Sequence, residues 1–235
     1  GKILSARGCP FDCAFCAQSV HHKTKCDVFG LCSEEEIAEA YRDAARLPIG
    51  RFGVVTSGPS QGMAAVERIA GAVKRARRSK ASWCASLGRM GAEELRALKK
   101  AGVKRYHHNI ETAASYFPRV CTTHTHADRI ATLRAARKAG LQVCSGGILG
   151  MGESLEQRVE MAFTLARERV DSIPLNFLVP VAGTRLGRLA PMEPLDILKT
   201  IAMFRLVNPR AEIKVCAGRS HLRQLQSMIF YAGAT

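Results

Sequence analysis

Three closely spaced cysteines, Cys9, Cys13 and Cys16, are the residues of this chain whose type and spacing most clearly indicate chemistry. They form a CxxxCxxC pattern directly after a short apolar run. Three thiolates on one tight loop can ligate three irons of a four-iron cluster. The fourth iron then has no protein ligand and offers a vacant position for a small molecule, as in catalytic metal sites. The spacing therefore predicts an iron–sulfur centre with one open iron.

Two other uses of close cysteines fit the chain less well. A structural zinc site needs a second pair of cysteines or histidines downstream of the first pair, and no second pair follows Cys13 and Cys16. A disulfide framework is typical of small secreted domains, whereas the nine cysteines here are spread over 235 residues. A basic, zinc-holding nucleic-acid-binding module remains as the alternative from another functional class.

The composition bounds the classes of protein to which the chain can belong. It is 47% hydrophobic, which suits one sizeable core. No apolar run reaches the ~18 residues of a membrane-spanning helix, and we expect a cytoplasmic protein with no membrane contact. The formal charge of +15 makes nucleic acid a candidate partner. The densest basic run, residues 74–80, lacks interleaved aromatic residues, so we interpret it as a solvated helix face and expect no nucleic-acid binding.

Short apolar, β-prone runs alternate with helical stretches along the chain. Ser33, Ser154 and Pro194 mark helix starts, and Gly102 and Gly140 mark helix ends. Strand–helix–strand units of this length need parallel pairing with a right-handed crossover. The predicted strands cover residues 2–5, 51–56, 82–86, 105–109, 142–145, 172–178 and 212–216. The pattern predicts an α/β fold, a TIM-type (β/α) barrel with seven βα units in a single domain, residues 1–235, with the eighth strand missing.

Cysteines and polar residues fall where these predicted strands end. In (β/α) barrels, the chemistry is located at the carboxyl ends of the strands. The cysteine triplet follows the first predicted strand, and the remaining candidates lie within or after later strands: Cys84, Asn109, Glu111, Cys144, Asn176 and Arg219. We therefore expect these side chains to meet at one rim of the barrel.

The CxxxCxxC loop, with an aromatic residue before its third cysteine, resembles the radical S-adenosylmethionine superfamily, and the chain is most similar to its biotin synthase family. The similarity covers nearly the whole chain and rests on the blocks CAFCAQS (13–19), CASLG (84–88), YHHNIET (106–112), CSGGILGMGE (144–153), IPLNFL (173–178) and AGR (217–219). It implies a sulfurtransferase that inserts sulfur into dethiobiotin to form biotin. Barrels of the hydrogenase-maturation or methylornithine-forming type, which share the triplet, are the alternative within the superfamily.

The resemblance also implies roles for individual residues. Cys9, Cys13 and Cys16 would ligate a 4Fe–4S cluster, and the amino and carboxylate groups of S-adenosylmethionine would complete its open iron. The cosubstrate would be contacted by Phe15, Asn109, Glu111, Arg129, Ile148 and Gly150, and dethiobiotin by Asn176. A radical formed from S-adenosylmethionine would take hydrogen from dethiobiotin, and an auxiliary cluster would supply the sulfur. Partners implied in this way are reduced flavodoxin or ferredoxin as electron donor and a second copy of the chain in a homodimer.

The auxiliary cluster is where the chain departs from the most familiar members of that family. Cys84, Cys144 and Arg219 match three of its four expected ligands, but the second predicted strand has no cysteine. The resemblance to a group from anaerobes implies a larger auxiliary cluster, with Cys26 and Cys121 as added ligands. We interpret the two remaining cysteines, Cys32 and Cys216, as core or incidental thiols. Both ends of the chain also resemble internal points of the family, so we expect a fragment of a longer protein.

Overall fold

A single parallel sheet organises the chain in the computed structural model, which describes residues 1–6, 8–76 and 80–235. All seven strand pairings are parallel. The strands are β1 (Lys2–Ser5), β2 (Arg51–Thr56), β3 (Ser82–Ser86), β4 (Arg105–His107), β5 (Gln142–Cys144), β6 (Gly147–Leu149), β7 (Ser172–Phe177) and β8 (Glu212–Val215). The predicted α/β class and the positions of all seven predicted strands are confirmed.

The count of strands differs from the prediction at one place. The fifth predicted strand is followed, after Ser145 and Gly146, by the short strand β6, so the described residues form eight strands. Both β5 and β6 pair with β7, and together they occupy one position in the sheet. The interruption has a steric cause, because a Cβ on Gly146 would lie 1.9 Å from the Pro174 carbonyl oxygen. The chain approaches its neighbour too closely there for a regular ladder.

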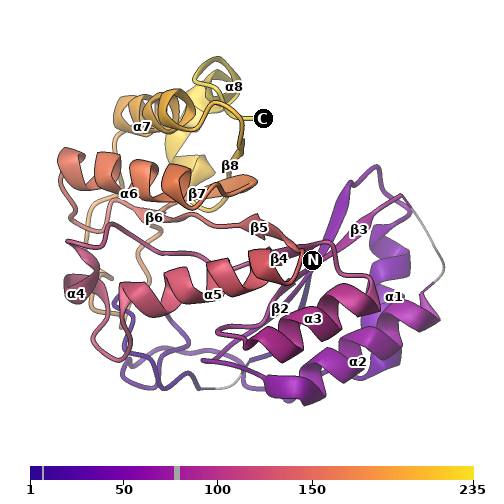
Figure 1. Cartoon of the computed structure of the whole chain (residues 1–235). Coiled ribbons are helices and arrows are strands. Elements are labelled where there is room, and N and C mark those ends of the chain that lie inside the picture. Colours follow the sequence, from indigo (N-terminus) through magenta and orange to yellow (C-terminus); the bar gives the residue numbers. More distant parts are fainter. Residues whose placement is uncertain (7, 77–79) are drawn as a thin grey trace.

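Helices follow most strands and cover the outer face of the sheet (Figure 1). The capping signals act as expected: Ser33 and Ser154 each form a capping box, Pro194 lies in a first turn, and Gly102 ends its helix with a left-handed φ of 109°. The helices are α1 (Glu34–Ala44), α2 (Gly62–Arg75), α3 (Ala92–Ala101), α4 (Phe117–Val120), α5 (His126–Lys138), α6 (Leu155–Arg167), α7 (Pro194–Val207), the 3₁₀ segment η1 (Arg219–Ser227) and α8 (Met228–Tyr231).

The sheet is strongly curved, as the ion pairs of the Glu212 carboxylate show. Along the sheet order, β2 and β8 are five strand positions apart, which in a flat sheet corresponds to roughly 24 Å. Glu212 of β8 nevertheless pairs with Arg51 of β2 at 2.9 Å and with Arg105 of β4 at 2.8 Å. The inner face of the sheet therefore encloses a lumen, as in a barrel. Figure 1 shows the strands bending around this space, with β1 and β8 as the outer strands of the described sheet.

The opposite faces of the strands pack against the helices and form the main core. Tyr41 of α1 stacks on Trp83 of β3 with ring centroids 4.3 Å apart, and Phe52 of β2 meets the same ring edge-on at 5.3 Å. Such a cluster buries a large apolar area and stabilises the contact of helix and sheet. The strand faces that turn away from these helices are left to line the lumen.

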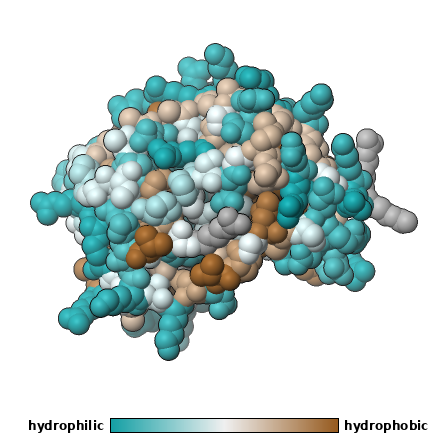
Figure 2. All heavy atoms as spheres, turned by 90° about the horizontal axis from the view of Figure 1, so that it is seen from below, coloured by the Kyte–Doolittle hydropathy of each residue, from teal (hydrophilic) through white to brown (hydrophobic). Residues whose placement is uncertain are grey.

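The surface carries mostly polar groups. None of the helices in the described parts of the chain has the length and apolar content that crossing a membrane requires. Figure 2 shows one face on which hydrophilic residues surround small, separate hydrophobic groups. Of the basic run at 74–80, Lys74 and Arg75 lie in the last turn of α2, whereas residues 77–79 lie outside the described residues.

We expect Glu212→Gln to lower the free energy of unfolding by about 2 kcal/mol, because Arg105 is 3% exposed and loses its charged partner. This figure is at the low end for a broken buried pair because the Glu212 side chain is 38% exposed. Urea denaturation at pH 7 measures the difference. The matched control is Glu39→Gln, which changes an exposed carboxylate of α1 and should leave the unfolding midpoint unchanged.

The pH dependence of stability distinguishes the loss of this ion pair from a change in packing. Hydrogen bonding to Arg105 holds the pKa of Glu212 well below its usual value. A depressed carboxyl pKa stabilises the fold above the unfolded value of ~4.3, and that contribution is lost as the pH falls. The stability gap between the parent protein and Glu212→Gln should therefore be nearly constant from pH 7 to pH ~5 and should narrow progressively below pH ~4. A gap that stays constant from pH 7 down to pH ~2 would contradict the prediction.

Candidate metal centre

The cysteine triplet lies on a loop that follows β1 and closes on itself through backbone hydrogen bonds. Cys9 N–H donates to the Gln18 carbonyl at 2.8 Å, and Val20 N–H donates to the Cys9 carbonyl at 3.0 Å. Cys16 N–H donates to the Cys13 carbonyl at 2.9 Å, which forms a tight turn between these two cysteines. Cys9 and Cys13 are buried, Cys16 is half-buried, and all three are free thiols. The loop therefore presents three sulfur donors within one short segment.

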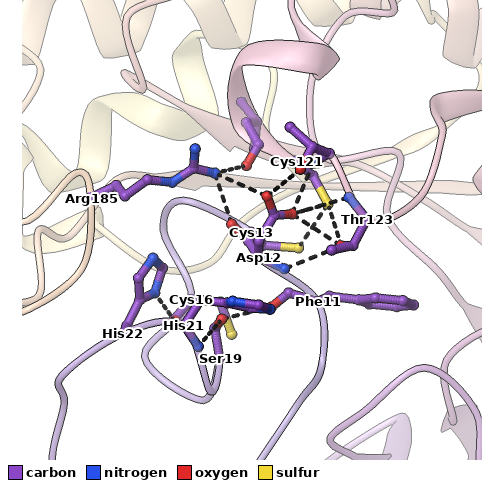
Figure 3. Close-up of polar contacts among 12 residues, drawn as sticks. Phe11, Asp12, Cys13, Cys16, Ser19, His21, His22, Cys121, Thr123 and Arg185 are labelled. Atoms are coloured by element: carbon purple, nitrogen blue, oxygen red, sulfur yellow. Dashed lines mark hydrogen bonds and ion pairs between the residues drawn. The ribbon is translucent and has the colours of Figure 1, made fainter.

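Asp12 attaches this loop to the segment that follows α4 (Figure 3). Its carboxylate accepts hydrogen bonds from Thr122 N at 2.9 Å, Thr122 Oγ1 at 2.6 Å, Thr123 N at 3.2 Å and Thr123 Oγ1 at 3.0 Å. Arg185 adds a bridge, because its Nη2 donates to the carbonyls of Asp12 at 2.8 Å and Val120 at 2.9 Å. The position of the triplet is thus set by groups more than 100 residues away in the sequence.

A cavity of about 260 Å³ lies between this loop and the carboxyl ends of β2, β3 and β4. Seven of the residues predicted to form the site line it together: Cys9, Cys13, Cys16, Phe15, Asn109, Glu111 and Arg129. Serine and glycine from the ends of β2 and β3 complete its wall, together with Arg89, His107, His108 and His124. The structure thus brings the strand-end residues Asn109 and Glu111 to the same cavity as the triplet.

Glu111 and Arg129 form a buried ion pair on the floor of the cavity. Glu111 Oε1 lies 3.2 Å from Arg129 Nη1, and this same nitrogen donates to the Asn109 carbonyl at 2.9 Å. Burial raises the pKa of Glu111, while Arg129 and Asn109 act in the opposite direction. Glu111 also has a left-handed φ of 69°, and its carbonyl accepts from Ile148 N at 2.8 Å. The carboxylate of Glu111 and the guanidinium of Arg129 thus line the same cavity as the triplet loop.

Cys121 lies beside the triplet, and the structure does not bring it to Cys84 and Cys144. Its Sγ is 3.7 Å from Cys13 Sγ, and the two residues share a small apolar cluster with Phe117. The hydrogen bond between the two sulfurs raises the pKa of Cys13 and lowers that of Cys121. The resemblance implied that Cys121 joins Cys84 and Cys144 as a ligand of the auxiliary cluster, but the segment after α4 directs its side chain to the triplet instead.

His124 is a site residue that the sequence reasoning missed. Its Nδ1 lies 3.2 Å from Cys121 Sγ, and its Nε2 accepts a hydrogen bond from Arg129 Nε at 3.0 Å. Cys13, Cys121 and His124 offer donor atoms within 4.8 Å of one another, the only such group of three among the described residues. A signal was present in the sequence, because His124 stands between two residues already selected, Cys121 and Arg129.

The glycine-containing segment after β6 lies next to the cavity and does not line it. Gly150 has a φ of 85°, and its N–H donates to Glu153 Oε1 at 2.8 Å. Arg158 pairs with the same carboxylate at 2.8 Å and so fixes the turn. Ile148 packs with Phe15 in an apolar cluster at the edge of the triplet loop. Ile148 and Gly150 are therefore near the predicted cosubstrate position without forming its wall.

A second group of cysteines lies on other strands: Cys84 is half-buried on β3, Cys144 is buried on β5, and Cys216 is exposed directly after β8. Burial raises the pKa of Cys144 to about 11, opposed by Ser172, Arg105 and Lys214. Burial also raises the pKa of Cys84, opposed first by Arg105, and that of Cys216, opposed by Lys214. His107 Nδ1 lies 3.3 Å from Cys144 Sγ, and burial followed by Lys214 lowers the pKa of His107 to about 4.

Cys216 was interpreted from the sequence as incidental; it is an exposed thiol that directly follows β8. Side chains alternate along a strand, so Glu212, Lys214 and Cys216 share one face of β8 and its extension. Glu212 reaches Arg105 across the lumen, which identifies that face as the inner one. The period-of-two pattern of β8 was therefore a signal from which the position of Cys216 follows.

The remaining predicted residues lie elsewhere. Cys26 is exposed, and its thiol donates to the Ala17 carbonyl at 3.2 Å on the outer side of the triplet loop. Arg219 is exposed at the start of η1. Asn176 uses its amide to hold neighbouring segments, since Nδ2 donates to the Gly147 carbonyl and Oδ1 accepts from Ala217 N, both at 3.1 Å. After β8 the chain forms η1, which contains a kink at Arg223, and then α8.

Comparison with solved structures concerns the fold alone. A methylornithine synthase has a TM-score of 0.78 at 19% sequence identity, covering 99% of this chain and 68% of that one. A maturase of the [FeFe]-hydrogenase also has a TM-score of 0.78, at 16% identity, covering 99% of this chain and 54% of that one. The described sheet and its helices therefore have the arrangement found in these enzymes.

Comparison with sequences is more specific. The model of the Radical SAM superfamily matches residues 3–165, and that of the Biotin and Thiamin Synthesis associated domain matches residues 174–235. The chain is 52% identical over 226 residues to the biotin synthase of Maridesulfovibrio salexigens, covering 96% of this chain and 69% of the relative. It is 49% identical to that of Geotalea daltonii, covering 100% and 73%. The chain belongs to the Radical SAM superfamily and, within it, to the biotin synthase family.

Proposed function

We propose that the chain carries the catalytic barrel of a biotin synthase, which inserts sulfur into dethiobiotin in a radical reaction that uses S-adenosylmethionine. The observation that supports this most strongly is the meeting of the three triplet cysteines with Glu111 and Arg129 at one cavity. A second group of thiols, inside the same sheet, is the other requirement of the reaction. We also propose that residues 1–235 fold as one domain, because β7 and β8 extend the sheet built by β1 to β6.

Cys9, Cys13 and Cys16 fit a 4Fe–4S cluster. Their thiols are free, they border the same cavity, and the loop that carries them is short enough to serve adjacent irons. When bound, such a cluster supplies the electron that cleaves S-adenosylmethionine and so initiates hydrogen abstraction from dethiobiotin. The chain itself orients the reactants and excludes water from the lumen. Burial of Cys13 and the apolar contacts of Phe15 serve this exclusion.

The ion pair of Glu111 and Arg129 is the proposed contact for the amino acid part of S-adenosylmethionine. A guanidinium binds a carboxylate with two parallel hydrogen bonds, and a carboxylate accepts from an ammonium group. Asn109 holds this ion pair in place. Its backbone carbonyl accepts a hydrogen bond from Arg129, and its side-chain Nδ2 donates to Glu111 at 3.4 Å. Phe15, Ile148 and the turn at Gly150 lie next to this contact, where the nucleoside would extend.

Cys84, Cys144 and Cys216 are the proposed ligands of the auxiliary cluster. The charges of Arg105 and Lys214 act on Cys84 and Cys144, and that of Lys214 acts on Cys216, so both would offset the negative charge of thiolate ligands. Gly53 of β2 pairs in register with Cys84, and a Cβ added there meets no atom within 4 Å. The strand that lacks the expected cysteine thus leaves open space beside Cys84, which suits a cluster larger than 2Fe–2S.

Several partners remain proposals that follow from the family. Dethiobiotin would enter the lumen beside Asn176, whose amide already binds the backbone of Gly147 and Ala217. A low-potential carrier, reduced flavodoxin or ferredoxin, would deliver the electron, and the chain would form a homodimer. An acidic carrier is compatible with the net charge of +15.

We expect Cys13→Ala to abolish the formation of 5′-deoxyadenosine from S-adenosylmethionine, because the cluster loses one of its three ligands. The assay is chromatography of the products under anaerobic, reducing conditions. Cys32→Ala is the matched control, since Cys32 does not line the cavity and its thiol donates to the Ile3 carbonyl at 3.8 Å. Normal 5′-deoxyadenosine production by Cys13→Ala would show that the triplet does not hold the reactive cluster.

We expect the auxiliary cluster to contain more than two irons and to require Cys216. Mössbauer spectroscopy with iron and sulfide analysis of the anaerobically reconstituted protein measures the cluster type. Cys216→Ala should lose the auxiliary signal and retain cleavage of S-adenosylmethionine, whereas Cys26→Ala should retain both. The observation of a 2Fe–2S spectrum that persists in Cys216→Ala and disappears in Arg219→Ala would contradict this assignment.

A further inference from the structure

Arg89 is a cation that borders the cavity of the triplet loop, and its backbone is fixed by neighbouring segments. Its N–H donates to the Pro59 carbonyl at 2.6 Å. The hydroxyl of Tyr106 donates to the carbonyl of the preceding residue, Gly88, also at 2.6 Å. Gly88 has a left-handed φ of 80°, and a Cβ there would lie 2.3 Å from the Pro59 carbonyl oxygen. The turn after β3 is therefore held from two sides and places the arginine at the cavity.

The guanidinium of Arg89 lies over the ring of Phe11, which belongs to the triplet loop. Its Cζ is 5.2 Å from the ring centroid, and the same ring packs on His124 with centroids 4.2 Å apart. A guanidinium is attracted to the face of an aromatic ring, and its planar shape keeps the N–H donors in a fixed fork. The contact with Phe11 therefore orients the fork and occupies none of its N–H groups.

Among the residues that the structure describes, none accepts a hydrogen bond from this guanidinium. Its ion-pair partner is Asp128, whose Oδ2 lies 3.7 Å from Arg89 Nη1, which is longer than a hydrogen bond. That oxygen already accepts from the N–H and the hydroxyl of Thr125, both at 2.9 Å, in the capping box of α5. The donors of Arg89 are therefore available to solvent or to a ligand in the cavity.

Arg129, the other arginine at the cavity, is engaged by protein groups to a greater extent. Its Nε donates to His124 at 3.0 Å, and its Nη1 donates to the Asn109 carbonyl at 2.9 Å. Glu111 pairs with the same Nη1 at 3.2 Å and offsets the charge. A carboxylate has lone pairs for about four donors, which is more than the Nη2 group of Arg129 supplies. An anionic ligand of this cavity therefore has a use for a second guanidinium.

We propose that Arg89 is a binding residue that donates hydrogen bonds to the carboxylate of S-adenosylmethionine, beside Arg129. This rests on the proposed function, because it requires the cosubstrate to occupy the cavity. The carboxylate belongs to the amino acid part of the cosubstrate, and the nucleoside part carries no anionic group. Hydrogen bonds between a guanidinium and a carboxylate are charge-assisted and match in shape. Phe11 supports this contact because it holds the plane of the guanidinium.

The test is calorimetric titration of the anaerobically reconstituted protein with two stable analogues, in the absence of dethiobiotin. S-adenosylhomocysteine has the amino acid carboxylate, whereas 5′-methylthioadenosine lacks the whole amino acid part. Arg89→Met keeps an unbranched side chain and removes the charge and the donors. We expect it to weaken the binding of S-adenosylhomocysteine about tenfold and to leave that of 5′-methylthioadenosine unchanged. The matched control is Arg96→Met on the exposed face of α3, which should change neither affinity.

Equal losses for both analogues in Arg89→Met would overturn the proposal, because the residue would then shape the cavity and not bind the carboxylate. Unchanged affinities for both would overturn it as well. A separate titration with dethiobiotin, the other carboxylate of the reaction, covers the remaining case: weakened binding of dethiobiotin alone would assign the guanidinium to the substrate. Failure of the proposed function looks different, because the parent protein would then bind neither analogue and show no iron–sulfur signal.

Discussion

The whole site depends on the attachment of the cysteine loop to the turn after α4 by the Asp12 carboxylate. Burial alone would raise the pKa of Asp12, but hydrogen bonds from Thr122, Cys121 and Thr123 hold it well below its usual value. The carboxylate is thus ionised at neutral pH and binds its donors strongly. Without this attachment, a loop rich in small residues would have many conformations. Metal binding alone would then have to offset the entropy lost when the three thiols become ordered.

The two groups of sulfur atoms lie at different places in the same barrel, and each has its own electrostatic environment. The triplet lies at the rim beside the Glu111–Arg129 pair, whereas Cys84 and Cys144 face the ammonium of Lys214 inside the lumen. Glu212 completes the inner group by pairing with Lys214 at 3.0 Å as well as with Arg105. A reaction that generates a radical at one sulfur centre and consumes sulfur from another needs this separation within a shared, dry interior.

Close backbone approaches explain why the strand ends carry the site. A Cβ on Gly147 would lie 2.1 Å from the Glu111 carbonyl oxygen, and one on Gly146 would overlap the Pro174 carbonyl. These glycines allow β6 to pass close to the segment after β4, in which Glu111 has a left-handed φ. The strain is local and compensated by the ion pair with Arg129. Substitution at either glycine would therefore displace the carboxylate together with the backbone.

The sequence by itself determined the parallel α/β architecture, the capped helices at Ser33 and Ser154, and the triplet with Asn109 and Glu111 at strand ends, because these signals are local or repeat with the period of the fold. Arg129 was indicated only by the resemblance to the family. Only the tertiary structure decided which thiols meet. Cys121 follows a strand end in the sequence yet lies against Cys13, and only the contact of Glu212 with Arg105 shows which face of β8, the one that Cys216 continues, turns inward. The physical reason is that the curvature of the sheet and the path of each turn decide which side chains meet, and both depend on the conformations of many residues. Strand and helix patterns, in contrast, depend on residues that are close in the sequence.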